Sequence, residues 1–271
     1  MLPRMTDRPG APAPLILVTV VDPARTADPA LAQRKNELYA SAVSARGADA
    51  VLVSASTPVL DRDRALATMA GLLLTGGADI SPSHYGEAVT GAAELDPDRD
   101  GLELAAWLAA QARSVPVLGV CRGHQAINVF SGGKLLQDVA GHAGAAYGQG
   151  PTQMHILEID PASMLGRALA SAAPDGVAGE EEEDAALELE VNSFHHQAVG
   201  IGMLGPGLKA VAWADSPVGR IVEGLEADDD RWVVGVQCHP ERLESTPEEF
   251  GGLWQAFVDA AAEFAASGKP G

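Results

Sequence analysis

The stretch VPVLGVCRGHQAINVFSGG, residues 115–133, decides the fold. Its first six residues form an apolar run of the kind found in a strand that is buried on both faces of a parallel sheet. The next part, RGHQAINVFSGG (122–133), predicts a helix that ends at Gly132-Gly133. A buried strand that passes directly into a helix is half of a βαβ unit. Cys121 lies at the junction between the two.

Similar strand and helix patterns precede this stretch. The segments LILVTVV (15–21) and ADAVLVSA (48–55) predict strands, residues 30–46 predict a helix, and DRALATMAGLLLTGG (63–77) predicts a helix followed by a strand. A long loop over 78–99 leads to a helix over 100–114, where Asp100 and Glu103 resemble a capping pair. The pattern predicts an α/β fold with three layers: a mostly parallel open sheet and helices on both of its faces.

The second half of the chain has a different character. QMHILEID, LELEVN, LKAVAWA, GRIVEGLEA and RWVVGVQC are closely spaced runs that predict an antiparallel extension of the sheet, and residues 247–267 predict an amphipathic final helix. The acidic run GEEEEDA (179–185) is typical of a solvated loop, and residues 1–13 are rich in proline and are expected to be disordered. Without a repeat or a linker, residues 14–271 are interpreted as one domain.

Composition narrows the functional classes. The 271 residues carry 18 Lys and Arg against 37 Asp and Glu, a formal net charge of −19, which argues against a nucleic-acid partner. No stretch reaches the roughly 20 apolar residues of a membrane span, and prolines interrupt the N-terminal apolar residues before a signal-like segment can form. Two cysteines are too few for a disulfide scaffold. The expectation is a cytoplasmic protein.

The position of Cys121 suggests a nucleophile. A residue on a tight strand-to-helix turn projects into the crevice at the carboxyl ends of parallel strands, and Gly119 and Gly123 allow strand, turn and helix to pack closely. The start of the helix favours a thiolate, and the N–H of Arg122 is placed to bind an oxyanion. Taken with its flanking glycines alone, Cys121 is explained equally well as a small buried apolar residue.

A base for such a nucleophile lies at the end of another predicted strand. VVGVQCHPERL (233–243) runs into His239-Pro240-Glu241. If the chain stays extended through Pro240, the side chains of His239 and Glu241 point the same way, so Glu241 can orient the imidazole. On its own this segment is more often a surface turn. By the same alternation Cys238 points away and is expected in the core.

Two further segments are candidates for the site. Gly76-Gly77 ends a strand at the same edge, where Gly77 can supply a second N–H to an oxyanion, although a simple turn explains the pair equally well. His195 and His196 in VNSFHHQAVG (191–200) raise the question of a metal. Their side chains diverge and no third ligand lies at zinc spacing, so they are interpreted as pocket-lining or structural.

These motifs together resemble a known family. GVCRGHQ (119–125) with HPE (239–241) resembles the class I glutamine amidotransferase fold. With TGGADISPSHYGE (75–87), DRDGLEL (98–104), VNSFHHQAV (191–199) and GVQCHPE (235–241), the chain resembles the gamma-glutamyl-gamma-aminobutyrate hydrolases, a family of cysteine peptidases. Cys238 stands where an aromatic residue is common in that family.

The resemblance implies hydrolysis of the gamma-glutamyl amide bond of a small compound through a thioester, and a role in polyamine catabolism. It implies that Cys121, His239 and Glu241 form a catalytic triad and that the N–H groups of Gly77 and Arg122 form the oxyanion hole. Gln125 would help bind the glutamyl head group, and Gly76, His195 and His196 are further substrate-binding candidates. The resemblance implies that the protein needs no metal or other cofactor. It also leads us to expect a homodimer.

Two other functions remain open. A glutaminase subunit that passes ammonia to a separate synthetase would have the same catalytic half. A non-catalytic protein that binds gamma-glutamyl compounds could use the same fold. The sequence does not identify the amine or peptide on the far side of the bond.

Overall fold

One mixed sheet organises the protein. The computed structural model describes residues 12–144, 150–172 and 186–268, so the acidic run 179–185 and residues 1–11 lie outside the described residues. Within the described residues ten strands form one sheet in the order β2-β1-β3-β4-β10-β9-β8-β5-β6, and β7 pairs with β9. The strands are β1 Leu15–Thr19, β2 Asp49–Val53, β3 Gly71–Leu74, β4 Val117–Val120, β5 Gln153–Ile159, β6 Leu187–Ser193, β7 Val199–Gly200, β8 Leu208–Ser216, β9 Gly219–Ala227 and β10 Val233–Val236.

The sheet has a parallel half and an antiparallel half. Strands β2, β1, β3, β4 and β10 run parallel to one another. From β9 onward, all the pairings along the order are antiparallel in the described residues. All residues of β3, β4 and β10 are buried, as their apolar runs require. The predicted fold class is therefore confirmed, including its antiparallel extension.

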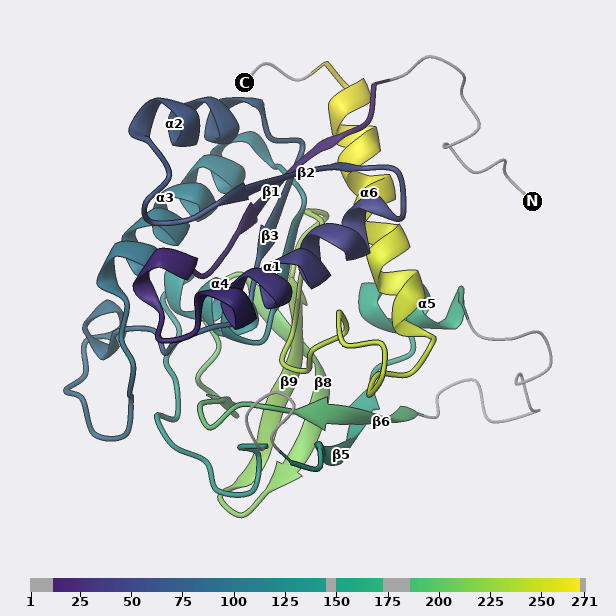
Figure 1. The fold of residues 1–271 in the computed structure, drawn as a ribbon. Coiled ribbons are helices and arrows are strands. Elements are labelled where there is room, and N and C mark those ends of the chain that lie inside the picture. Colours follow the sequence, from purple (N-terminus) through teal and green to yellow (C-terminus); the bar gives the residue numbers. More distant parts are fainter. Residues whose placement is uncertain (1–11, 145–149, 173–185, 269–271) are drawn as a thin grey trace.

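Helices cover both faces of the parallel half (Figure 1). Apolar side chains of α1, α5 and α6 pack into one core, and those of α2, α3 and α4 pack into the other. The helices are α1 Pro29–Ser44, α2 Val59–Thr68, α3 Pro97–Arg113, α4 Arg122–Phe130, α5 Met164–Ala170 and α6 Phe250–Ala266, with short 3₁₀ turns at Pro23–Arg25 and Pro82–Tyr85. Because strands β3, β4 and β10 are central, the carboxyl ends of all three meet between these layers.

The prediction that Asp100 and Glu103 cap the start of α3 is wrong. The helix begins three residues earlier than expected, and the side chain of Asp96 accepts a hydrogen bond from the N–H of Arg99. Asp100 and Glu103 are fully buried instead. Both carboxylates are ion-paired, so the sequence signal that resembled a cap belongs to an interior electrostatic cluster.

That interior cluster, which we call the buried ion cluster, consists of Arg99, Asp100, Glu103 and Arg122. Glu103 binds the guanidinium groups of Arg99, at 2.8 Å, and Arg122, and Arg122 also binds Asp100 at 2.5 Å. Burial raises the pKa of Glu103, but Arg122 and Arg99 outweigh it and hold the pKa below its usual range. The cluster ties the first turn of α4, and hence the turn at Cys121, to α3.

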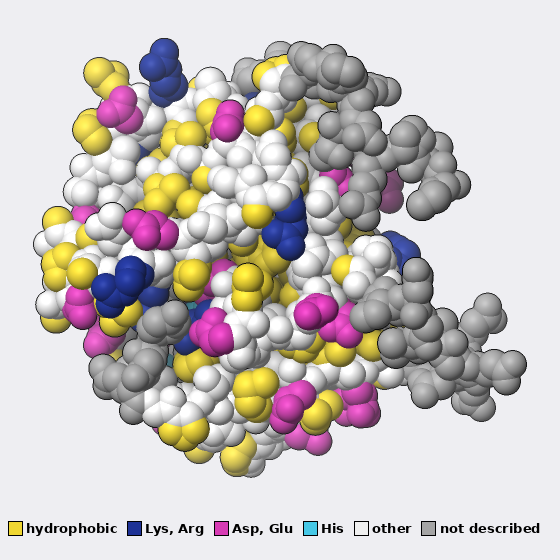
Figure 2. Space-filling view, turned by 45° about the vertical axis from the view of Figure 1, so that its right-hand side comes forward, with side chains coloured by type: hydrophobic (Ala, Val, Ile, Leu, Met, Phe, Trp, Pro, Cys, Tyr) yellow, Lys and Arg dark blue, Asp and Glu magenta, His cyan; other side chains and the backbone are white. Residues whose placement is uncertain are grey.

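Acidic side chains are spread among apolar and basic ones on the face shown in Figure 2. Among the described residues, none of the helices combines the length and the hydropathy that crossing a bilayer requires.

Replacing the shared carboxylate of the cluster should be strongly destabilising. We expect Glu103→Gln to lower the free energy of unfolding by about 3–5 kcal/mol, because two buried guanidinium groups lose their common anion. Urea unfolding followed by circular dichroism measures this. Glu263→Gln, at an exposed position on α6, is the control and should change stability by less than about 0.5 kcal/mol. Equal effects of the two variants would contradict the role of the cluster.

Candidate active site

Cys121 occupies a strained turn between β4 and α4. Its backbone angles are φ 53° and ψ −106°, a region that residues other than glycine rarely adopt. Such strain costs on the order of 1–3 kcal/mol and is common at functional sites. The turn is closed by two glycines: a Cβ on Gly119 would lie 2.5 Å from the carbonyl oxygen of Gly123, and a Cβ on Gly123 would lie 2.0 Å from that of Leu74.

The structure brings His239 and Glu241 to Cys121 from the end of β10. Nδ1 of His239 lies 2.6 Å from Oε1 of Glu241, and the imidazole also forms a hydrogen bond with Cys121. A Cβ on Gly76 would lie 2.8 Å from Cε1 of His239 and 3.6 Å from Cβ of Cys121, so only glycine fits beside this pair. The three residues that sequence motifs singled out therefore meet as a Cys-His-Glu arrangement.

The electrostatics of this group favour an imidazolium. Burial lowers the pKa of His239, but the Glu241 carboxylate and the Cys121 thiolate outweigh it and raise the pKa to about 10. His239 therefore keeps its proton at neutral pH, with its ring beside the sulfur of Cys121. Tyr39 lies behind the ring, with its hydroxyl 3.4 Å from Nδ1 of His239. Burial, then Glu241 and Cys121, raise the pKa of Tyr39 well above its usual value, so the phenol stays neutral.

Two residues that hold His239 were not identified from the sequence. Oδ1 of Asn192 accepts the N–H of His239 at 2.8 Å, and Nδ2 of Asn192 donates to the carbonyl oxygen of His239 at 3.0 Å. The ring of Phe194 packs edge-on against His239, with 5.7 Å between centroids. Both belong to the VNSFHHQ segment, whose histidines had been singled out instead. The segment was informative, but which of its side chains faces the site depends on the path of the loop.

Gln125 holds the catalytic turn through a second glutamine. Its Nε2 donates to the carbonyl oxygen of Gln197 at 2.9 Å and to Oε1 of Gln237 at 3.1 Å. Nε2 of Gln237 lies 3.6 Å from the sulfur of Cys121. Gln125 is not among the residues that line the pocket described next, and its contact with the glutamyl group stays a prediction.

A pocket of about 690 Å³ opens in front of the sulfur. Cys121, His239, Glu241, Gly76 and Gly77 line it together. Cationic and anionic side chains are mixed around the remaining wall: Arg25, Lys35, Arg99 and Arg242 with Asp28, Glu94 and Asp96. Nη1 of Arg99 is buried and has no hydrogen-bond partner in the part of the chain that the structure describes, although the rest of the guanidinium is engaged by Glu103 and Thr75. The wall can bind a small molecule that carries both signs of charge.

The backbone N–H groups considered for an oxyanion hole are those of Gly77, which lines the pocket, and Arg122, which follows the pocket residue Cys121. Arg122 is the first residue of α4, where the N–H has no partner within the helix, and its side chain points into the buried ion cluster. The backbone of Gly77 lines the pocket, whereas the N–H of Gly76 is engaged by the Tyr39 hydroxyl at 3.1 Å. The roles of Gly77 and Arg122 as oxyanion donors stay predictions.

The structure places His195 and His196 away from the pocket wall. His196 lies between Asp79 and Asp138, with Nε2 3.0 Å from Oδ2 of Asp79. His195 is buried beside Glu223, with 3.4 Å between Nε2 and Oε1. Burial lowers the pKa of His195 to about 4 despite the nearby carboxylate. Both rings face these protein partners, and the contact of the two histidines with substrate stays a prediction.

Comparison with known proteins identifies the family of this chain. The family model for peptidase C26 matches residues 16–241, which include Cys121, His239 and Glu241. The chain belongs to the peptidase C26 family. This family assignment makes the protein a glutamine amidotransferase-like hydrolase of the cysteine type.

Individual relatives agree with the peptidase C26 assignment. YvdE of Lactococcus lactis is 38% identical over 194 residues, which are 69% of this chain and 72% of YvdE. Rv2859c of Mycobacterium tuberculosis is 33% identical over 204 residues, 74% of this chain and 58% of that protein. Their names assign them provisionally as glutamine amidotransferase-like and glutamine amidotransferase, respectively. The glutaminase domain of Trypanosoma brucei CTPS, whose structure was solved with bound acivicin, has the same fold, with a TM-score of 0.56. It is 16% identical in sequence, and the match covers 93% of this chain and 94% of that one.

The two cysteines should differ sharply in reactivity. We expect iodoacetamide to alkylate Cys121 and to spare Cys238, because Cys121 lines the pocket while burial raises the pKa of the Cys238 thiol well above its usual value. Peptide mass spectrometry of the native protein measures both sites. Cys121→Ser should abolish native labelling and Cys238→Ala should retain it. Equal labelling of both cysteines would contradict this description of the site.

The pKa of His239 should depend on Glu241. We expect Glu241→Gln to move the pKa of His239 from about 10 to a lower value, since the main group that raises it is removed. Titration of the histidine ring resonances in ¹⁵N-labelled protein measures the shift. Glu244→Gln, at an exposed position three residues along, is the matched control and should leave the value unchanged. An unshifted His239 in Glu241→Gln would show that another group sets its protonation.

Proposed function

We propose that this peptidase C26 family protein hydrolyses the gamma-glutamyl amide bond of a small gamma-glutamyl compound. The observation that carries the proposal is the group formed by Cys121, His239 and Glu241: a strained cysteine, a buried imidazolium beside it and a carboxylate 2.6 Å from the far nitrogen of the ring. A thiolate paired with an imidazolium is ready both to attack a carbonyl and to protonate a leaving amine.

The first half of the reaction forms a thioester. The sulfur of Cys121 attacks the gamma-carbonyl carbon, and the carbonyl oxygen becomes an oxyanion that the N–H groups of Gly77 and Arg122 would bind. The tetrahedral intermediate then collapses. The C–N bond breaks, the oxygen regains its double bond, and His239 gives its proton to the departing nitrogen, so the amine leaves neutral.

The second half regenerates the enzyme. His239, now neutral, takes a proton from water as the water oxygen attacks the thioester carbon. The second tetrahedral intermediate expels the sulfur of Cys121, which returns to a thiolate beside the imidazolium, and glutamate is released. Glu241 stays ionised throughout and holds the ring through Nδ1, which is an orienting role.

The pocket wall supports a glutamyl head group. A glutamyl compound carries an alpha-carboxylate and an alpha-ammonium group, and the wall presents guanidinium groups and carboxylates close to the sulfur. Arg99 is suited to the carboxylate, since one of its nitrogens is unpaired beneath Gly77. The volume of about 690 Å³ also leaves room for a group beyond the amide nitrogen. This room, with the motif resemblance to the gamma-glutamyl-gamma-aminobutyrate hydrolases, favours a gamma-glutamyl amine over glutamine itself.

Glutaminase activity is the second candidate, and the names of YvdE and Rv2859c favour it. The same thioester chemistry on glutamine would release ammonia, which a separate synthetase would consume. The two functions differ in the leaving group, so a comparison of substrates separates them.

Glutamate release from a panel of compounds tests the proposal. We expect gamma-glutamyl-gamma-aminobutyrate or gamma-glutamyl-putrescine to be cleaved with kcat/KM well above that for glutamine, with a gamma-glutamyl dipeptide as a further comparison. Cys121→Ala should lower kcat by at least about 10⁴-fold with the circular dichroism spectrum unchanged, and Glu241→Gln should lower it less than His239→Ala.

Cys238→Ala is the matched control and should retain activity, because Cys238 packs in the core away from the pocket. Cleavage of glutamine alone, or cleavage only after a synthetase is added, would replace the hydrolase with a glutaminase subunit. Full activity in Cys121→Ala would end the cysteine mechanism, and tight binding of these compounds with no turnover by the wild type would indicate a binding protein.

A further inference from the structure

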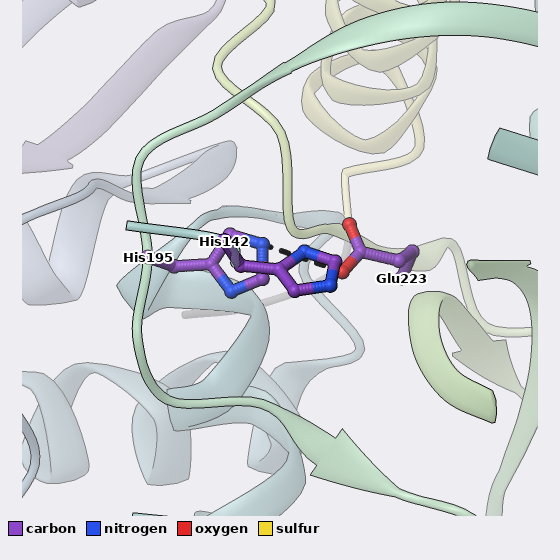
Figure 3. A group of neighbouring side chains, drawn as sticks. All are labelled: His142, His195 and Glu223. Carbon is purple, nitrogen blue, oxygen red and sulfur yellow. Dashed lines mark ion pairs between the residues drawn. The ribbon is translucent and has the colours of Figure 1, made fainter. Parts of the chain in front are cut away.

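A second polar group lies outside the pocket of Cys121. His142, His155, His195 and Glu223 form what we call the histidine–glutamate cluster. They come from four places: the segment before residue 145, strand β5, the link between β6 and β7, and strand β9. Figure 3 shows His142, His195 and Glu223 converging, with the ion-pair contact from His195 to Glu223 drawn as a dashed line.

The carboxylate of Glu223 lies at the centre of this cluster, between the rings of His155 and His195. Its residue is fully buried, and neither oxygen has a hydrogen-bond donor among the described residues. The nearest polar atoms are Nε2 of His195, 3.4 Å from Oε1, and Nε2 of His155, 3.4 Å from Oε2. A buried carboxylate without donors or a cation costs several kcal/mol, so the structure calls for a positive charge at this point.

The hydrogen bonding of His195 shows which nitrogen carries its proton. Nδ1 lies 2.9 Å from the carbonyl oxygen of Gln197, which can only accept. Nδ1 therefore carries the hydrogen, and in the neutral ring Nε2 presents a lone pair toward Glu223. Two acceptors then face each other across 3.4 Å. An imidazole nitrogen fixed by a hydrogen bond from the opposite nitrogen to a backbone carbonyl is the usual arrangement of a histidine that binds a metal.

The other two histidines complete the surroundings. Both ring nitrogens of His155 are buried, and among the described residues neither has a hydrogen-bond partner, although Nε2 lies 3.4 Å from Oε2 of Glu223. The ring of His142 lies with its centroid 5.0 Å from those of His155 and His195. One ligand atom from each of His142, His195 and Glu223 can be chosen so that all lie within 4.8 Å of one another.

The spacing fits a small metal ion. Zinc binds histidine nitrogen and carboxylate oxygen at about 2.0–2.1 Å, and in a tetrahedron this places neighbouring ligand atoms about 3.4 Å apart. The contact from Nε2 of His195 to Oε1 of Glu223 is of that length, whereas His155 contacts the other oxygen, Oε2. Two imidazoles and one carboxylate favour zinc over calcium or magnesium, which prefer oxygen ligands, and over copper(I), which prefers sulfur.

We propose that His142, His195 and Glu223 form a binding site for zinc or a similar divalent transition metal, with His155 in contact with the second oxygen of the carboxylate. This site goes beyond the hydrolase activity and does not depend on it. Its residues do not line the pocket, so the metal has a structural role. It would tie β5, β9 and the β6–β7 link together next to β10, where the carbonyl oxygen of Glu223 accepts the N–H of Gln237 at 2.8 Å. The proposal departs from the expectation that the chain uses no metal.

Zinc content and zinc-dependent stability test the site. The full chain, produced without a polyhistidine tag, should retain about one zinc ion after dialysis, measured by elemental mass spectrometry. After metal removal with a chelator, zinc at about 100 times its Kd should raise Tm by about 5–10 °C. Cobalt(II) should give the intense visible absorption of a tetrahedral site with nitrogen and oxygen ligands.

Variants separate this site from chance binding. His195→Gln and Glu223→Gln should lose the bound zinc, the Tm shift and the cobalt spectrum. His196→Gln is the matched control, since the neighbouring ring lies between Asp79 and Asp138, and it should keep all three. If a cluster variant does not fold, the cobalt spectrum of the wild type decides alone. If the wild type shows no bound zinc, no Tm shift and no cobalt spectrum, the proposal is overturned in favour of a protonated histidine paired with Glu223. If His195→Gln binds as much zinc as the wild type, the proposal is overturned in favour of zinc binding at the surface.

Discussion

The strained backbone of Cys121 is the constraint on which the rest of the structure depends. A residue with φ 53° and ψ −106° cannot hold that conformation by itself, so its neighbours must impose it. Gly119 and Gly123 do so from within the chain, because they let β3, β4 and α4 approach more closely than any side chain would permit. The buried ion cluster does so from outside, since Arg122 anchors the first turn of α4 to Asp100 and Glu103 on α3. The sulfur is thereby fixed at the edge where the parallel strands end.

Charged side chains are buried at several places in this molecule, and the role of each depends on the groups with which it pairs. In the ion cluster each guanidinium has a carboxylate, and the group is structural. At His239 the two neighbouring anions outweigh desolvation and leave the ring protonated, which suits it to protonate a leaving amine. At Glu223 the carboxylate lacks donors among the described residues, and that imbalance is what the metal proposal resolves. The same low-dielectric interior therefore supports a scaffold, a proposed active site and a proposed metal site, according to which partners each charge has.

Most of the fold was predictable from local patterns. The apolar runs of β3, β4 and β10 and the amphipathic pattern of α6 gave the right element types, with ends displaced by a few residues. Asp100 and Glu103 misled the interpretation of α3, because a capping pair and a pair of buried ion ligands have the same spacing. The candidate catalytic residues at the strand ends were also predictable. Cys121 directly follows a strand, and His239 lies two residues before Glu241, so each pattern is local in the sequence. The structure brings the three side chains together.

The sequence by itself determined the strand and helix pattern, the turn at Cys121 and the pairing of His239 with Glu241, because each follows from residues that are close along the chain. Only the tertiary structure decided which side chains surround them. Asn192 and Phe194 face His239 while His195 and His196 of the same segment turn away, and Tyr39 reaches the site from α1. The partners of His195 lie at residues 142, 155 and 223, separated by strands that pair only in the folded sheet. Spacing along the chain carries no information about such contacts, since the packing of the sheet and its loops creates them.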